Sequence, residues 1–430
     1  MKPAAHAQAA IEILADLDAR RRPVTDALKD WGLSHRFAGS KDRAGIASLV
    51  YDVLRKRASL AWRMGAETPH ALVLGALAFT RGLDADVIAS SFADSPHAPP
   101  ALSDAERRAI AGGTLEGAPE WVRGDYPEWL DEHLLGTFGD TRADEGAALA
   151  ERAPLDMRVN ALKGTRAEAL AELSHLGAEA TPFAPFGIRI PLLADGRGPP
   201  VQSEPAFLKG LVEVQDEGSQ IAALVAGAKP GEQVIDLCAG AGGKTLALAA
   251  SMDNKGQLFA HDRDIRRLAP LHERAQRAGV SNLQIRSPRG KEDVLSDLER
   301  RADLVVVDAP CTGTGTWRRN PDAKWRLRPN ALEMRRGEQA AVLAEAARLV
   351  KPGGRLAYIT CSILPEENEK QIDAFRTAHP DFTAVPAATA AEAAGLGALA
   401  AHATADNSAL LLTPHRSGTD GFFVALLERS

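Results

Sequence analysis

The chain has 430 residues, 45% of them hydrophobic and 25% charged, so it should form two or three ordinary globular domains. Its three cysteines exclude a disulfide scaffold, and no apolar run is long enough for a membrane span or a signal peptide, so we expect a cytoplasmic protein. The formal charge of −6 excludes a uniformly basic nucleic-acid binder but not local basic patches.

Residues 1–140 are predicted to form an all-α domain, because apolar residues recur at helical spacing over residues 5–19 and 46–60. Within residues 36–63, seven basic residues stand against two acidic ones. This window is either a solvated helix face or a phosphate-binding surface, and the second interpretation gains weight only if the rest of the chain handles nucleic acid.

Two further domains are expected. Residues 141–220 combine short strands with one helix, typical of a small α+β subdomain. From residue 221 to 430, strands alternate with helices, which indicates βαβ units and an open parallel sheet with helices on both faces. The predicted strands of this domain are 233–238, 257–261, 283–286, 303–308 and 355–361, and the helices are 245–251, 265–278, 338–350 and 366–378. Such sheets bind ligands at the carboxyl ends of their strands.

The first of these strands leads into the glycine-rich run D-L-C-A-G-A-G-G-K-T, residues 236–245. A Walker phosphate loop would need glycine at Cys238, and the dinucleotide fingerprint would need glycine at Thr245, so both patterns fail. Asp262 follows the next strand, at the distance from the loop at which an acid can accept both ribose hydroxyls. A ribose without phosphates to cradle indicates S-adenosylmethionine; the alternative is a tight strand–helix turn without a ligand.

All three cysteines lie at the carboxyl ends of predicted strands of this one sheet. Cys238 lies in the glycine loop, Cys311 in D-A-P-C-T-G-T-G (308–315), and Cys361 in T-C-S (360–362). Any one of them could be an inert core residue. Three at strand ends favour a site, and without a C-x-x-C pair or a histidine array a zinc site is not expected.

These residues suit methyl transfer to carbon 5 of a cytosine. That carbon is a weak nucleophile until a thiolate adds to carbon 6, an acid stabilises the charge near ring nitrogen 3, and a base then removes the carbon 5 proton. Cys361, Asp308 and Cys311 could supply one nucleophile, one acid and one base. The pattern does not decide which cysteine attacks.

The chain resembles the bacterial RNA cytosine-5-methyltransferases called Sun-like or Fmu-like. The resemblance is carried, over residues 150–430, by V-Q-D-E-G-S-Q (214–220), D-L-C-A-G-A-G-G-K-T (236–245), D-A-P-C-T-G-T-G (308–315), T-C-S-I-L-P-E-E-N-E (360–369) and D-G-F-F-V-A (420–425). It implies a Rossmann-like S-adenosylmethionine-dependent methyltransferase domain. It also implies that Cys361 is the nucleophile and that Cys311 assists product release, opposite to the Pro-Cys arrangement of DNA cytosine methyltransferases.

The expected cofactor contacts are Asp262 with the ribose, Asp308, and the backbone of the loop formed by Cys238, Ala239, Gly240, Ala241, Gly242, Gly243 and Lys244. Two positions depart from the family pattern. Gly240 and Ala241 stand where the family has alanine and proline, and R-S-P-R-G-K-E-D (286–293) offers only Asp293 for the family's adenine-contacting Asp. We assign no adenine contact.

The expected substrate is RNA. Residues 318–336 hold seven basic against two acidic residues, interleaved with Trp325 and preceded by Trp317, which is typical of a nucleic-acid channel; the alternative is a basic surface loop with tryptophans in the core. The N-terminal segment more loosely resembles the NusB-like RNA-binding domain through D-R-A-G-I-A-S-L-V-Y-D-V-L-R (42–55) and Y-P-E-W-L (126–130). This combination implies the branch that methylates 16S ribosomal RNA.

We therefore expect an enzyme that methylates carbon 5 of a cytosine in 16S ribosomal RNA through a covalent cysteine adduct. The alternatives are a transfer-RNA cytosine-5-methyltransferase and a non-catalytic RNA-binding ribosome-assembly factor; intact Asp308, Cys311 and Cys361 argue against the second. We expect no metal, no membrane contact and no obligate protein partner.

Overall fold

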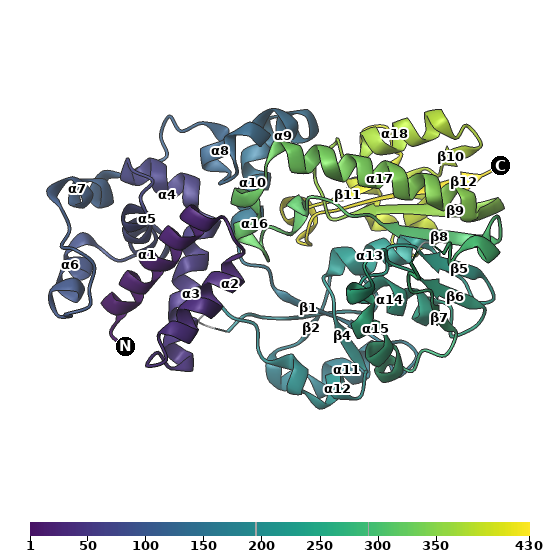
Figure 1. The fold of residues 1–430 in the computed structure, drawn as a ribbon, viewed down its shortest axis with the longest axis horizontal. Coiled ribbons are helices and arrows are strands. Elements are labelled where there is room, and N and C mark those ends of the chain that lie inside the picture. Colours follow the sequence, from purple (N-terminus) through teal and green to yellow (C-terminus); the bar gives the residue numbers. More distant parts are fainter. Residues whose placement is uncertain (194–195, 291) are drawn as a thin grey trace. The chain divides into compact units, whose positions relative to one another are not determined.

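The computed structural model describes residues 1–193, 196–290 and 292–430 (Figure 1). The chain divides into two compact units. A helical unit comprises residues 1–152 and 317–327, and an α/β unit comprises residues 153–316 and 328–430. The small α+β segment and the segment with the predicted parallel sheet thus share one unit, whereas residues 317–327, from between two strands of that sheet, belong with the N-terminal helices.

The helical unit is built from amphipathic helices around one apolar core. Its helices are α1 (Pro3–Arg20), α2 (Val24–Ser34), α3 (Ser40–Arg55), α4 (Arg57–Met64), α5 (Pro69–Gly75), the π-helix η1 (Ala76–Thr80), α6 (Ala85–Ala93), α7 (Asp104–Gly112), α8 (Glu120–Arg123), α9 (Asp131–Phe138), α10 (Arg142–Ala150) and α16 (Pro321–Arg326). Ile13 and Leu14 of α1 and Val50 of α3 are among its fully buried side chains. The single helix predicted over residues 46–60 is wrong, since the helix breaks at Lys56.

The α/β unit contains an eight-stranded sheet. Its strands are β5 (Gln233–Asp236), β6 (Gln257–Ala260), β7 (Leu283–Ile285), β8 (Ala302–Asp308), β9 (Val350–Thr360), β10 (Phe382–Ala384), β11 (Ala409–Leu412) and β12 (Phe422–Arg429). The order is β10-β12-β9-β8-β5-β6-β7, with β11 also paired to β12. Strands β5 to β9 are parallel, as predicted. The prediction missed β10, β11 and β12, which add an antiparallel edge.

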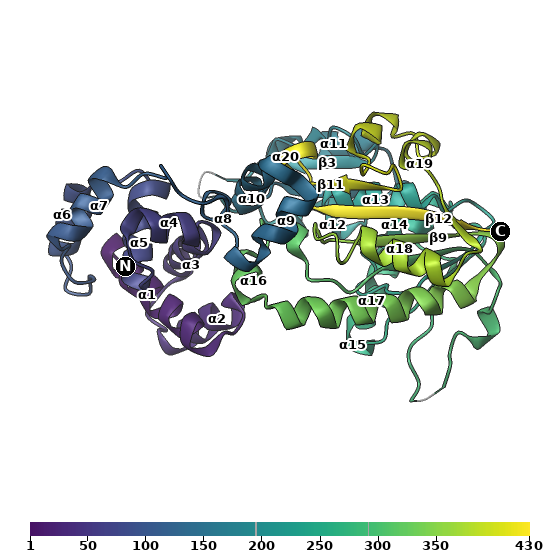
Figure 2. The ribbon, with the colours of Figure 1, turned by 90° about the horizontal axis from the view of Figure 1, so that it is seen from above.

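Helices cover both faces of this sheet, as expected for buried parallel strands. The helices are α13 (Glu217–Ala226), α14 (Gly243–Ser251), α15 (Ile265–Ala278), α17 (Pro329–Leu349), α18 (Glu369–Ala378), α19 (Ala387–Ala393) and α20 (Pro414–Ser417). Figure 2 shows α17 and α18 on one side of β9 and β12, and α13 and α14 on the other. Along β8, Leu304 to Val307 are fully buried. The fold is thus Rossmann-like, and the carboxyl ends of β5, β6, β8 and β9 meet at one edge.

A four-stranded antiparallel sheet precedes the large one within the same unit. Its elements are β1 (Leu155–Val159), β2 (Glu179–Ala180), β3 (Gly187–Ile190) and β4 (Val212–Val214), with helices α11 (Arg166–Glu172) and α12 (Pro205–Leu208). The strand order is β2-β3-β1-β4. Arg158 of β1 donates to Gln215 Oε1 (2.7 Å), and Gln220 of α13 donates to Met157 O (3.3 Å), so hydrogen bonds link this sheet to the first helix of the large one.

No helix in the described ranges is long and apolar enough to cross a membrane.

Candidate active site

The loop between β5 and α14 folds back tightly over the end of the neighbouring strand. Ala239 N donates to His261 O (2.8 Å). Gly240 and Gly242 have φ of +51° and +87°, and a Cβ on Gly242 would lie 2.1 Å from Leu271 Cδ1. The glycine at 242 is therefore required by both its backbone conformation and the close approach of α15. The loop presents bare backbone at the start of a helix, as expected from the sequence.

Asp262 joins this loop to the end of β6. Its side chain is almost fully buried; Oδ2 accepts a hydrogen bond from Gly240 N (3.0 Å), and Arg267 Nη1 lies 3.1 Å from the same oxygen. The other oxygen accepts from Asp264 N (2.9 Å). The structure thus brings the predicted ribose-binding acid and the predicted methionine-binding loop together. An acidic side chain beside glycine backbone fits the ribose and amino-acid ends of S-adenosylmethionine.

Lys244 contributes a side-chain interaction that the sequence analysis did not predict. Its Nζ lies 2.8 Å from Asp308 Oδ2 and 5.0 Å above the ring of Phe422, and its side chain is buried. Asp308 is the last residue of β8. The ion pair therefore crosses from the cofactor loop to the strand that carries the predicted acid, and it places a positive charge beside that carboxylate.

Asp236, the last residue of β5, is a second buried carboxyl group at this edge. Burial raises its pKa to about 7, although Thr245 Oγ1 donates to Oδ2 at 2.6 Å. Its other oxygen has no hydrogen-bond partner among the described residues. Next to it, burial and the surrounding carboxylates raise the pKa of the Cys238 thiol. The raised pKa disfavours the Cys238 thiolate, consistent with a role of this residue through its backbone.

The other two cysteines meet. The Sγ atoms of Cys311 and Cys361 are 3.3 Å apart, within hydrogen-bond distance for thiols, although 50 residues separate them in sequence. The hydrogen bond to Cys361 and burial raise the pKa of Cys311 well above its usual value. Both thiols belong to loops that follow neighbouring parallel strands, β8 and β9. Two strand ends therefore supply a pair of adjacent thiols, with Asp308 on the same strand as one of them.

A buried carboxyl group supports the loop that carries Cys311. Glu367 accepts from Thr312 N (2.8 Å), Thr312 Oγ1 (2.5 Å) and Gln339 Nε2 (3.0 Å), and Gln339 Nε2 also donates to Pro310 O (3.0 Å). Burial raises the pKa of Glu367. Glu367 stands in the quoted T-C-S-I-L-P-E-E-N-E run, but the sequence alone assigned it no role. Gln339, inside α17, carried no sequence signal.

The D-G-F-F-V-A motif (420–425), at the start of β12, contacts the loop that follows Cys311. Gly315 N donates to Cys361 O (2.9 Å), and Gly421 N donates to Gly315 O (2.8 Å). A Cβ on Gly315 would lie 2.3 Å from Gly421 O. The glycines of D-A-P-C-T-G-T-G and D-G-F-F-V-A are therefore needed because two backbone segments touch beside Cys361.

The carboxylate of Asp293 is held by an ion pair and by a backbone hydrogen bond. Arg348 Nη1 lies 2.9 Å from its carboxylate and lowers its pKa, and Leu295 N donates to it (3.1 Å). It lines a cavity of about 430 Å³ that is also lined by His261 and Arg263, the neighbours of Asp262. Lys291, within the same quoted run, lies outside the described residues. Among the described residues, no three histidine, cysteine, aspartate or glutamate side chains are grouped to hold a metal ion.

The predicted basic channel over residues 318–336 is wrong for two of its basic residues, whereas the alternative of a tryptophan in the core is confirmed for the residue just before this window. Trp317, Arg318 and Lys324 are buried in the helical unit. Lys324 Nζ donates to the carbonyls of Arg55 (2.7 Å) and Asp125 (2.6 Å). Three further arginines of the window pair with carboxylates, Arg326 with Asp322, Arg335 with Glu338 and Arg336 with Glu333. A charge pattern in the sequence could not distinguish an exposed channel from a buried anchor.

Family models match most of the catalytic half of the chain. One described as "16S rRNA methyltransferase RsmB/F" matches residues 223–428, and one described as "Methyltr_RsmF/B-like, ferredoxin-like domain" matches residues 126–192.

Curated relatives and a solved structure agree with these matches. Probable ribosomal RNA small subunit methyltransferase B of Synechocystis sp. is 33% identical over 308 residues, 71% of this chain and 67% of the relative. Ribosomal RNA small subunit methyltransferase B of Klebsiella pneumoniae is 30% identical over 368 residues, 79% of this chain and 83% of the relative. The crystal structure of PH0851 is 29% identical with a TM-score of 0.73, covering 100% of this chain and 99% of that one. The chain therefore belongs to the RsmB/F family of S-adenosylmethionine-dependent 16S rRNA methyltransferases.

Proposed function

We propose that this enzyme methylates carbon 5 of a cytosine in 16S ribosomal RNA through a covalent adduct with Cys361. The observation that carries the proposal is the pair of thiols at the ends of β8 and β9, whose Sγ atoms are 3.3 Å apart. Strand β8 also ends in Asp308. A cytosine carbon that must be activated and later deprotonated needs two such groups within reach of one ring.

Cys361 is the proposed nucleophile. The Cys361 thiolate adds to carbon 6, which forms the C–S bond and moves an electron pair toward carbon 5 and ring nitrogen 3. Asp308, on the strand beside the thiols, donates a proton to nitrogen 3 as the negative charge develops there and takes it back when the ring double bond re-forms. Lys244, whose Nζ lies 2.8 Å from Asp308 Oδ2, adds a positive charge beside it. Bound S-adenosylmethionine supplies an electrophilic methyl group, which carbon 5 takes up.

Cys311 is the proposed base. Its raised pKa makes its thiolate, once the thiol proton has passed to solvent, a stronger base. The Cys311 thiolate takes the proton from carbon 5, the electron pair re-forms the ring double bond, and the C–S bond breaks to release Cys361 as a thiolate. The neighbouring Glu367 carboxyl contributes to the raised pKa of Cys311, which supports this division of roles.

The proposed cofactor contacts are the backbone from Cys238 to Lys244 for the methionine end and Asp262 for the ribose hydroxyls. Buried Asp262 and the positive-φ glycines of the loop support both. We also propose that residues 1–140 form a NusB-like RNA-binding domain.

Cysteine variants separate the two roles. Cys311→Ala still permits attack and methyl transfer, but its adduct cannot break down, so a covalent protein–RNA band should accumulate on a denaturing gel. Cys361→Ala should give neither methylation nor a band, and the double variant must lose the band. Cys238→Ala, which removes the third thiol, should trap nothing. A band with Cys361→Ala and none with Cys311→Ala would reverse the roles.

Bisulfite sequencing identifies the target. RNA from a deletion strain should lose one 5-methylcytosine in 16S ribosomal RNA. A loss confined to transfer RNA would replace the proposed substrate, and no loss at all would favour a non-catalytic assembly factor.

A further inference from the structure

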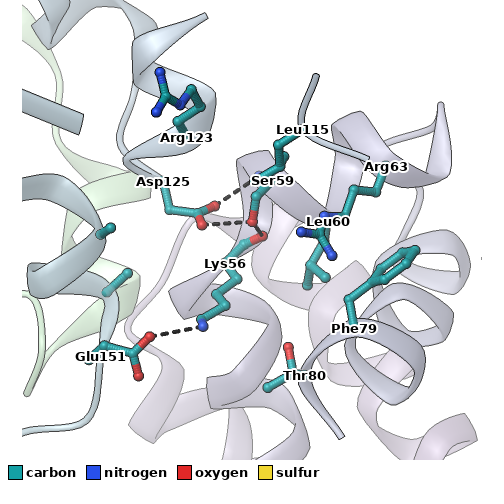
Figure 3. Close-up of a pocket in the computed structure, with 12 residues that line it drawn as sticks. Lys56, Ser59, Leu60, Arg63, Phe79, Thr80, Leu115, Arg123, Asp125 and Glu151 are labelled. Atoms are coloured by element: carbon teal, nitrogen blue, oxygen red, sulfur yellow. Dashed lines mark hydrogen bonds and ion pairs between the residues drawn. The ribbon is translucent and has the colours of Figure 1, made fainter. Parts of the chain in front are cut away.

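The helical unit contains a small pocket that the proposed chemistry does not use. Its volume is about 150 Å³, and its walls come from α4, η1, α8 and α10 and the loops next to them, all within residues 1–152 (Figure 3). The π-helix η1 contributes Phe79 and Thr80. Short π-helical segments cost regular hydrogen bonding and occur frequently at functional sites.

Arg63 is the distinctive residue of this pocket. Its guanidinium lies 4.7 Å from the centroid of the Phe79 ring, and Figure 3 shows it directed into the space between the labelled side chains. Its Nε is buried and has no hydrogen-bond partner among the described residues. The other two cations of the pocket differ, because Lys56 pairs with Glu151 (2.9 Å) and Arg123 with Glu120 (3.0 Å). Among the described residues, Arg63 therefore has no carboxylate partner for its charge and no acceptor for its Nε–H.

The other residues that line the pocket limit which ligand could bind to Arg63. Leu60, Leu115 and Ala147 are apolar, and Figure 3 shows the Thr80 hydroxyl directed toward the pocket. About 150 Å³ is room for roughly five water molecules at about 30 Å³ each, the scale of one flat heterocycle. Two carboxylates, Asp125 and Glu151, also line the pocket and would repel a phosphate group, whereas a base has apolar faces and a neutral polar edge. Guanidinium planes and aromatic rings are common partners of unstacked RNA bases.

We propose that this pocket captures one unstacked base of the RNA substrate, with Arg63 donating to the acceptor edge of the base and Thr80 beside it. The inference rests on the proposed RNA substrate, and it names a second place on the chain, remote in sequence from the cysteines, at which that RNA is read.

Two variants of the full-length protein test the pocket by different means. Arg63→Met removes the donor but keeps a side chain that can contact Phe79, and Ala147→Leu fills the pocket from an exposed helical position without changing charge. Their controls are Arg108→Met and Ala111→Leu, at exposed positions of α7 outside the pocket. Binding to an unmodified 16S rRNA transcript is measured by filter retention over a series of KCl concentrations.

Base capture predicts that Arg63→Met weakens binding about 5- to 100-fold with an unchanged salt slope, and that Ala147→Leu weakens it comparably. Both controls should bind like the wild type. A salt slope that falls by about 0.7–0.9 with Arg63→Met, with Ala147→Leu silent, would show a phosphate contact and overturn the proposal. Unchanged binding in both variants would also overturn it. Cytosine methylation by the wild type is measured separately. Absence of methylation refutes the proposed function, while Arg63-dependent RNA binding still supports the pocket.

Discussion

Glu367 accepts hydrogen bonds from the loop that carries Cys311, and its negative charge raises the pKa of that thiol. Glu367→Gln keeps the shape of the side chain but removes the negative charge, so the pKa of Cys311 should fall. Peptide-resolved alkylation with iodoacetamide across a pH series measures this, since only the thiolate reacts. Cys311 should react at lower pH in the variant.

The control is Glu369→Gln, a partly buried carboxyl two residues away that makes no hydrogen bond with Thr312 or Gln339 within the part of the chain that the structure describes. It should leave the Cys311 profile unchanged. Identical profiles for Glu367→Gln and the wild type would mean that Glu367 acts on the loop only by holding Thr312.

Asp262 carries a second prediction at the scale of one residue. Losing hydrogen bonds to a charged group costs about 1.5–3 kcal/mol, so Asp262→Ala should weaken S-adenosylmethionine binding roughly tenfold or more in calorimetry. Asp264→Asn is the control, because Asp264 caps α15 through Arg266 N and an asparagine can retain that cap. Unchanged affinity in Asp262→Ala would remove the ribose assignment.

At the scale of elements, residues 317–327 act as an anchor within the helical unit. Burial lowers the pKa of Lys324 to about 7, well below the value it regains on unfolding. Between about pH 7 and 10 the unfolded chain therefore binds more protons at this residue, and the stability of the folded unit at this site rises with pH. Below pH 7 Lys324 is charged in both the folded and the unfolded chain, so the full cost of burying the charge lowers the free energy of unfolding.

Lys324→Met should remove this pH dependence. The free energy of unfolding of the wild type, relative to the variant, should increase from pH 7 to pH 9. Tryptophan fluorescence in urea is a suitable probe, because all six tryptophans (Trp31, Trp62, Trp121, Trp129, Trp317 and Trp325) lie in the helical unit. Lys29→Met, at an exposed lysine of the same unit, should show no such trend. A constant difference between wild type and Lys324→Met would contradict the buried-charge argument.

At the scale of the whole molecule, a net charge of −6 must still admit an RNA polyanion. Many basic residues in the two predicted windows are paired with carboxylates; Arg57, for example, lies 2.7 Å from Asp18 and 2.9 Å from Glu67. Arg36 and Lys41 are exposed and have no ion pair among the described residues. The residues available to phosphates are therefore fewer than the sequence count suggests.

Replacing Arg36 and Lys41 together with glutamine should reduce the salt slope of RNA binding by about 1.4, as expected for two single-strand phosphate contacts. Arg57→Gln should leave the slope unchanged, because its charge is already compensated. Filter binding at several salt concentrations distinguishes them. If Arg57→Gln alone flattens the slope, its ion pairs open when RNA binds.

The sequence by itself determined the parallel strands, the glycine loop and the three cysteines at strand ends, because each depends on local pattern: buried runs, glycine at a turn, and residues directly after strands. The structure adds the strand order: β8 lies beside β9, so the loops that follow these two parallel strands meet, as Cys311 and Cys361 do.

Only the tertiary structure decided what depends on contacts between distant segments. The Lys244–Asp308 pair, the support of Thr312 by Glu367 and the burial of Lys324 join residues whose separation in sequence carries no period or motif. The basic window with tryptophans was consistent with an exposed channel and with a basic surface loop whose tryptophans lie in the core. The structure buries Trp317 and also the basic Arg318 and Lys324, and such burial is not encoded in the composition. The antiparallel strands at the C-terminal edge were missed for the same reason: their pairing partner, β9, had to be in place first.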